Sequence, residues 1–173
     1  MIHRALSDSD LRRILGRDLE IIKYSELSKF NDLNELLPND KDCCVILYED
    51  SLDHGHWIAL SKYKGIFEFF DSYGISPDGE LHWLNMKKKE NLNEARPYLS
   101  NLLEDNIYIY NHVRYQQSDL GIDTCGSHVA FRLFQLNNDN TNLHNYAAFM
   151  KSKRRLTGWS YDEIVANFVN KFF

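Results

Sequence analysis

The sequence lacks the features of a secreted or membrane protein. Its 173 residues include only three cysteines, and two of them, Cys43 and Cys44, are adjacent. An odd number with this spacing does not form a disulfide framework. No apolar run approaches the length of a membrane-spanning helix, and the first residues contain no hydrophobic signal core. These absences predict a reduced, intracellular protein that is not secreted and has no membrane partner.

An excess of positive charge is also missing. Twenty lysines and arginines face 25 aspartates and glutamates, which gives a formal net charge of −5. Because tight nucleic-acid binding needs a basic surface, nucleic acid is not an expected partner. The triplet Lys87-Lys88-Lys89 is more simply interpreted as a solvated face.

The composition nevertheless indicates a folded protein. Hydrophobic residues make up 43% of the chain and aromatic residues 13%. A chain of this length can bury a sizeable core, and no repeat or linker divides it. We therefore expect one domain over residues 1–173.

Hydrophobic periodicity predicts an α+β fold. Strands are expected at 20–24, 43–48, 57–63, 66–71 and 106–113. Helical segments are expected at 8–15, 27–37, 95–103, 125–136, 143–150 and 161–172. The apolar strand at 43–48 suits the centre of a sheet. These elements predict a central, mostly antiparallel or mixed β-sheet flanked by helices.

The stretch around Cys125 predicts a reactive thiol. A polar loop leads into this cysteine, and the apolar residues that follow repeat as in a helix buried on most faces. Asp123 or Thr124 is the expected N-cap. The free N–H groups at a helix N-terminus lower the pKa of a thiol, and the thiolate is the nucleophile. The alternative is a buried structural cysteine, as Cys43 and Cys44 are expected to be.

A cysteine nucleophile needs a base and a group that orients the base. His56 opens a predicted strand, and Asp71 ends the next strand 15 residues later. Because Lys64-Gly65 forms a tight turn, the start of the first strand lies beside the end of the second. His56 and Asp71 should therefore be hydrogen-bonded neighbours. The alternative is that Asp71 only ends its strand.

Acyl transfer to a thiol also needs donors for an oxyanion. The backbone N–H of Cys125 is one candidate, and the side-chain amide of Gln116 or Gln117 is the other.

Taken in order, these pieces resemble a known family. The motifs are Gly-His-Trp at 55–57, Phe-Phe-Asp-Ser-Tyr-Gly at 69–74, a glutamine, and Cys-Gly at 125–126 before a helix. They resemble adenovirus-protease-like and Ulp1-like cysteine peptidases, above all the maturation proteases of adenoviruses, virophages and Polinton-type elements.

The resemblance implies a papain-like fold with the nucleophile at the N-terminus of a buried helix. It implies that Cys125 is the nucleophile, that His56 is the general base and acid, and that Asp71 orients His56. It also implies that Trp57 forms a wall of the cleft. The family's glutamine lies closer to the cysteine than either glutamine here, so a one-residue insertion would favour Gln117 over Gln116. No metal or cofactor is expected.

The same resemblance implies a protein substrate. Relatives cleave capsid or core precursors during virion maturation, often after small residues such as Gly-X, and are packaged in the particle. A deubiquitinase or deSUMOylase acting on host conjugates is the alternative within the fold. A third possibility is a metal-binding or non-catalytic module, in which His54 and His56 share zinc with Cys125 or His128.

Overall fold

A mixed β-sheet forms the centre of the protein. The computed structural model describes residues 4–51, 54–83, 86–93, 95–118 and 121–173. The strands are β1 (Glu20–Lys23), β2 (Cys43–Ser51), β3 (His54–Tyr63), β4 (Ile66–Phe70) and β5 (Tyr108–Tyr110), and they lie in that order across the sheet. The pairs β2–β3 and β3–β4 are antiparallel, whereas β1–β2 and β4–β5 are parallel. The sheet is therefore mixed, and its antiparallel pairings are longer than its parallel ones.

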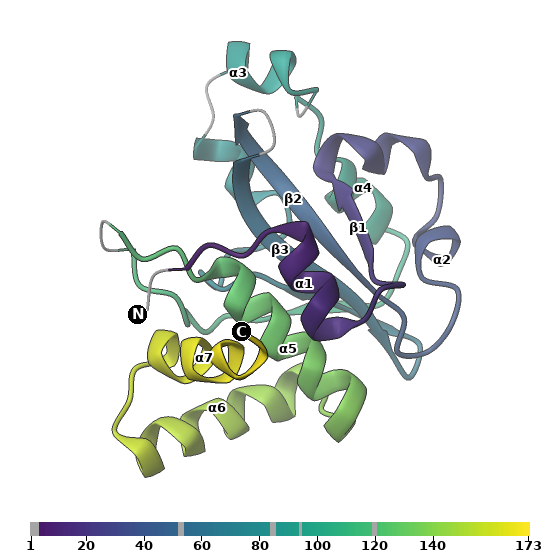
Figure 1. Ribbon diagram of the computed structural model, residues 1–173. Coiled ribbons are helices and arrows are strands. Elements are labelled where there is room, and N and C mark those ends of the chain that lie inside the picture. Colours follow the sequence, from purple (N-terminus) through teal and green to yellow (C-terminus); the bar gives the residue numbers. More distant parts are fainter. Residues whose placement is uncertain (1–3, 52–53, 84–85, 94, 119–120) are drawn as a thin grey trace.

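Helices cover both faces of this sheet (Figure 1). The α-helices are α1 (Asp8–Leu15), α2 (Leu33–Leu36), α3 (Met86–Asn91), α4 (Tyr98–Leu103), α5 (Cys125–Asp139), α6 (Leu143–Thr157) and α7 (Tyr161–Val169). Shorter 3-10 turns are η1 (Tyr24–Lys29), η2 (Gly79–Trp83) and η3 (Asn170–Phe172). One core joins the sheet to α1, α5, α6 and α7, and the other joins it to η1, α2 and α4.

The two cores explain why the central strands are almost entirely apolar. Successive side chains of a strand point to opposite faces of the sheet. In β2, Val45 and Leu47 enter the α5 core, whereas Cys44 and Ile46 enter the opposite core. The expected α+β architecture with a central β2 is confirmed. A strand buried on both faces is apolar at successive positions, and β2 accordingly shows no alternation of polar and apolar residues over its buried part.

Local signals fix the first and last helices. Ser7 and Asp10 form a capping box at α1, and Ser160 and Glu163 form one at α7. Both helices begin where the sequence predicts. A buried ion pair ties α5 to the sheet, because Arg132 Nη2 lies 2.6 Å from Glu68 Oε2 on β4.

Several element boundaries differ from the prediction. The strands predicted at 43–48 and 57–63 are longer in the structure: β2 continues to Ser51 and β3 begins at His54, with a register shift at Glu49/Ser51. Helix α5 continues to Asp139, beyond the predicted loop start, and ends at Asn140 in the left-handed region. Helix α6 runs past Met150 to Thr157.

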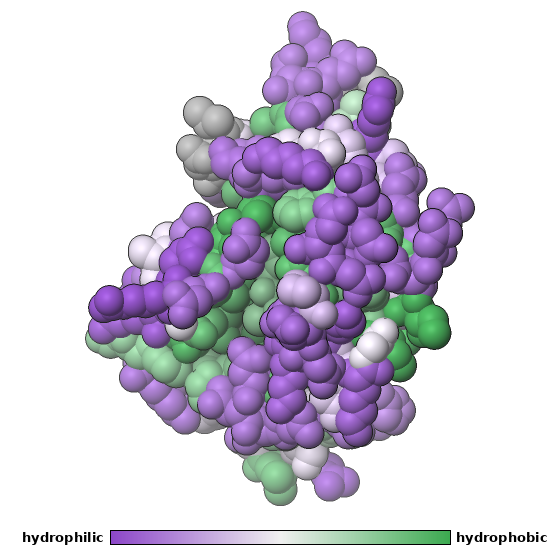
Figure 2. All heavy atoms as spheres, turned by 90° about the vertical axis from the view of Figure 1, so that its right-hand side faces the viewer, coloured by the Kyte–Doolittle hydropathy of each residue, from purple (hydrophilic) through white to green (hydrophobic). Residues whose placement is uncertain are grey.

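The face that carries β1 and α2 is largely hydrophilic, with apolar side chains gathered in a hollow across it (Figure 2). Among the helices in the described ranges, none has the length and apolar character needed to cross a bilayer.

Candidate active site

Cys125 is the first residue of α5 and lines a pocket of about 360 Å³. The N-cap is Thr124, one of the two predicted positions, but its side chain makes no capping hydrogen bond. The first turn therefore keeps backbone N–H groups for other partners. Cys125 is 4% exposed, and its sulfur lies 3.7 Å from Asp123 Oδ1.

The predicted pairing of His56 with Asp71 is confirmed. The β3–β4 register pairs Ala59 with Phe70, so the start of β3 runs past the end of β4. His56 Nε2 lies 3.0 Å from Asp71 Oδ1. The His56 side chain is 13% exposed and Asp71 is fully buried. The hairpin alone therefore brings imidazole and carboxylate into hydrogen-bond contact.

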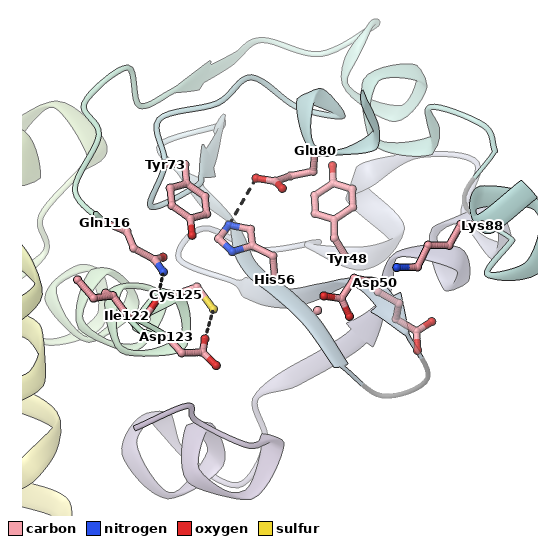
Figure 3. A pocket seen from close by; sticks show the side chains of 12 residues that line it. Tyr48, Asp50, His56, Tyr73, Glu80, Lys88, Gln116, Ile122, Asp123 and Cys125 are labelled. Carbon is pink, nitrogen blue, oxygen red and sulfur yellow. Dashed lines mark hydrogen bonds and ion pairs between the residues drawn. The ribbon is translucent and has the colours of Figure 1, made fainter. Parts of the chain in front are cut away.

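Cys125 lines the same pocket as His56. Figure 3 shows the His56 ring between Cys125 on one side and Glu80 on the other. Burial lowers the pKa of His56, but the hydrogen-bonding and charge effects of the Asp71 carboxylate, which accepts from the ring, and of the Cys125 thiol outweigh it and hold that pKa well above the usual value. A histidine in this position holds a proton readily, as a thiolate–imidazolium pair requires.

Asp71 is held by more than the histidine. Its Oδ1 also accepts a hydrogen bond from Tyr73 N at 2.8 Å, and Tyr73 stacks on the His56 ring. The side chain of Asn111 brackets the Asp71 backbone, accepting from its N–H at 3.0 Å and donating to its carbonyl at 2.7 Å. Burial raises the pKa of Asp71, but the hydrogen bond to His56 outweighs it, so the pKa lies below its usual value. Asp71 is therefore an anion facing His56.

Gln116, and not the preferred Gln117, reaches the pocket. Gln116 is 2% exposed and lines the pocket with Cys125. Its Oε1 accepts a hydrogen bond from Ser72 Oγ at 2.7 Å, and its Nε2 donates to the Ile122 carbonyl at 3.3 Å. These contacts fix the amide with its NH₂ group as the donor beside the thiol. Gln117 is exposed, and its backbone N–H donates to Asp162.

Trp57 lies behind the pocket rather than on its wall. The indole is 8% exposed, and its Nε1 donates to the Leu6 carbonyl at 2.9 Å. A Cβ added at Gly126 would lie 3.2 Å from the indole and 2.9 Å from Leu6 Cβ. Gly126 therefore lets the first turn of α5 approach β3 closely, which brings Cys125 to His56.

Sequence reasoning missed Glu80, which lines the same pocket. It belongs to η2, in a stretch for which the sequence predicts neither a helix nor a strand. Asp78 anchors that turn, because its carboxylate accepts from the Tyr48 hydroxyl at 3.1 Å and from Ser100 N at 2.7 Å. Glu80 is 5% exposed and its Oε1 lies 3.6 Å from His56 Nε2. No local pattern marks it, because its neighbours are distant in sequence.

A second buried cluster lies behind the start of α5. Asp162 on α7 lies 3.0 Å from His128 Nε2, accepts from the Thr124 hydroxyl, and accepts from Gln117 N at 3.1 Å. Asp162 therefore links Thr124, which precedes Cys125, to Gln117. From the sequence, Asp162 is expected only as part of the helix at 161–172.

The structure separates the residues of the zinc hypothesis. His54 is exposed and contacts Asp50 at 2.8 Å, and His128 contacts Asp162. Within the described ranges, the histidine, cysteine and acidic groups that gather within 4.8 Å of one another are His56, Asp71 and Glu80.

Cys43 and Cys44 behave as core residues. Cys44 is fully buried and Cys43 packs against the α5 core. Burial raises the pKa of both thiols. Among the residues that the structure describes, Cys125 is the cysteine that lines a pocket together with His56.

Comparison with known proteins adds a viral relationship. No family model matches the sequence. A similar protein is the uncharacterized protein V9 of Sputnik virophage, which is 33% identical over 165 residues. The match covers 93% of this chain and 91% of V9. This chain therefore belongs to the family of the Sputnik virophage protein V9.

Proposed function

We propose that this protein is a cysteine peptidase whose nucleophile is Cys125. The observation that carries the proposal is one imidazole that contacts a buried carboxylate and lines the same pocket as a thiol. His56 meets Asp71 at 3.0 Å, and the Cys125 thiol at this pocket helps to raise the pKa of His56. This is the arrangement that activates a thiol for acyl transfer.

The reaction follows from these contacts. The Cys125 thiolate attacks the carbonyl carbon of the substrate peptide bond, and the carbonyl oxygen becomes an oxyanion. Gln116 Nε2 and the backbone N–H of Cys125 are the donors for that oxyanion. His56 then protonates the departing amine, which leaves a thioester on Cys125. Water then attacks the thioester while His56 takes its proton. The acid product leaves, Cys125 is released as the thiolate, and His56 is again the imidazolium.

Asp71 and Tyr73 support this proton transfer. The Asp71 carboxylate stabilises the imidazolium and holds the ring by Nε2, so Nδ1 is the nitrogen that exchanges a proton with Cys125. Tyr73 stacks on the ring with centroids 4.9 Å apart, which limits its rotation. Ser72 holds the Gln116 amide by a hydrogen bond of 2.7 Å. One dipeptide, Asp71-Ser72, therefore supports both the base and the oxyanion donor.

We further propose a capsid or core precursor protein as the substrate, cleaved after small residues such as Gly-X, and a place of action in the assembling virion. The family relationship to a virophage protein supports a viral setting. The acidic composition supports a protein rather than a nucleic-acid partner.

Co-expression with the capsid proteins of the same virus tests this proposal. Mass spectrometry should identify new termini in the presence of the wild-type chain and none with Cys125→Ala. A parallel incubation with ubiquitin-like precursors distinguishes a maturation peptidase from an isopeptidase. Identical termini with wild type and Cys125→Ala would contradict the peptidase assignment.

A further inference from the structure

Two buried carboxyl groups share one histidine in the pocket. Asp71 is fully buried, Glu80 is 5% exposed, and one ligand atom of each lies within 4.8 Å of the others and of His56. If both were ionised, a single imidazolium would face two anions removed from water. Because an uncompensated buried charge is strongly unfavourable, one of the two carboxyl groups is expected to hold a proton.

The hydrogen bonds identify which group holds it. Asp71 Oδ1 accepts two hydrogen bonds, from His56 and from Tyr73 N. Glu80 Oε1 lies 3.6 Å from His56, too far for a hydrogen bond. Asp71 Oδ2 and Glu80 Oε1 are both buried, and neither has a hydrogen-bond partner among the residues that the structure describes. A proton on Glu80 would give Asp71 Oδ2 the donor that it lacks.

We propose that Glu80 is a positioning residue, held as the neutral acid, whose carboxyl O–H donates to Asp71 and completes a Cys125–His56–Asp71–Glu80 array. This inference rests on the proposed function for its catalytic meaning, but the protonation state can be measured without peptidase activity. The donated hydrogen bond keeps the negative charge on Asp71, the carboxylate that contacts His56.

The other groups at the pocket agree with this assignment. Burial, the hydrogen bond with Asp71 and the charge of Asp71 raise the pKa of Glu80 to about 9, although the charge of His56 opposes the shift. Strand β2 presents Tyr48, α5 presents Cys125, and α3 presents Lys88. Lys88 lies beyond Tyr48 (Figure 3), and its charge lowers the pKa of Asp50 instead. His56 is a cation that faces Glu80, with its Nε2 3.6 Å from Glu80 Oε1.

Carboxyl ¹³C NMR of protein labelled at glutamate measures the proton on Glu80 directly. The resonance lost in Glu80→Gln identifies the residue. We expect the shift of a neutral acid at pH 7 and a titration near pH 9. In Asp71→Asn the anion beside Glu80 is absent, so the titration should move to lower pH. A ¹³C chemical shift typical of an ionised carboxylate for Glu80 at pH 7 would overturn the proposal, whether or not the protein cleaves peptides.

Paired variants measure the positioning role. Glutamine keeps an N–H donor beside Asp71, whereas alanine removes it. We expect alkylation of Cys125 by iodoacetamide, and kcat where a substrate is in hand, to stay within about threefold in Glu80→Gln and to fall at least about tenfold in Glu80→Ala. Glu104→Gln, an exposed change at the end of α4, is the matched control.

The pH dependence of alkylation separates positioning from simple loss of packing. Because Glu80→Gln replaces one neutral donor by another, the midpoint of the alkylation profile should not move. If Glu80 were ionised, the same variant would remove a negative charge beside His56 and shift that midpoint downward. Such a shift, or equal rates in the two variants, would contradict the inference.

Discussion

Two histidine–aspartate pairs in the described part of the chain have the same hydrogen-bond distance, but the pKa values of their histidines are shifted in opposite directions. His56 meets Asp71, and His128 meets Asp162, in both cases with Nε2 at 3.0 Å from Oδ1. Yet the pKa of His56 is raised well above its usual value, while burial lowers the pKa of His128 despite its hydrogen bond to Asp162. Contact with a carboxylate alone therefore does not make an imidazole basic.

The difference lies in the surroundings of each ring. His56 is 13% exposed at a pocket that Cys125 also lines, and the thiol helps to raise its pKa. The Nδ1 of His128 has no hydrogen-bond partner in the described part of the chain, and the residue is fully buried. Asp162 is also engaged by Thr124 and Gln117 N. We propose that the first pair moves a proton and that the second holds the loop before α5.

The largest effect is expected from exchanging the two histidines for alanine. His56→Ala, like Cys125→Ala, should lower kcat at least ~10³-fold, because the proton acceptor or the nucleophile is gone. His128→Ala should mainly lower the free energy of unfolding. Peptide cleavage and urea unfolding, measured on both variants, check this. A His128→Ala protein that folds normally and is as inactive as His56→Ala would invert the assignment.

Asp71→Asn should lower kcat about 10²-fold, with little change in the urea midpoint. The amide cannot stabilise the imidazolium, and its NH₂ group clashes with the donor on His56 Nε2. The pKa of His56 should fall, because the hydrogen bond and charge of Asp71 contribute to raising it. A pH–rate profile on wild type and variant measures both effects. An unchanged kcat would indicate that Asp71 only follows the end of β4 and does not orient His56.

Asp162→Ala should lower the free energy of unfolding by about 2 kcal/mol, since it leaves buried donors on His128 and Thr124 unpaired. Asp162→Asn keeps the shape and is the conservative control. Urea unfolding followed by fluorescence gives the difference. Equal stability of wild type and Asp162→Ala would show that this pair does not anchor the loop.

The smallest effect is the pH dependence of stability, and the two pairs should give it opposite signs. The raised pKa of His56 stabilises the fold below the usual value of 6.5, and this stabilisation is lost as pH rises through its folded pKa. Because the pKa of His128 is lowered in the folded protein, the unfolded chain takes up this proton at a higher pH. The contribution of His128 to the free energy of unfolding is therefore fully present above pH 6.5 and falls as the solution is acidified.

His128→Gln should therefore flatten the acid side of the stability curve, where one group contributes a slope of at most about 1.4 kcal/mol per pH unit. His56→Gln should flatten the alkaline side. Melting temperatures between pH 5 and 9 separate the two; the same change in both variants would refute the comparison.

The sequence predicts the local parts of this structure well. Capping boxes locate α1 and α7, and the tight turn at Lys64-Gly65 places Asp71 beside His56, because these signals act over a few residues or one hairpin. The parallel pairings of β1 and β5 escape prediction, since nothing local selects a partner that is distant along the chain.

The candidate site shows the same limit. The order of the motifs identifies Cys125, His56 and Asp71. The choice between Gln116 and Gln117 depends on two long-range hydrogen bonds, one from Ser72 to the Gln116 side chain and one from the Gln117 N–H to Asp162. No sequence pattern marks Glu80. It is buried because the hydrogen bonds of Asp78 to Tyr48 and Ser100 hold the turn, and not because of the residues next to it in the sequence.

The most direct test of the His56–Cys125 relay is competitive alkylation of the folded protein at pH 6, with each cysteine quantified by mass spectrometry. We predict that iodoacetamide modifies Cys125 at least ~10-fold faster than Cys43 or Cys44, and that His56→Ala abolishes this advantage. Comparable rates at the three cysteines, or a Cys125 rate unchanged by His56→Ala, would contradict the account.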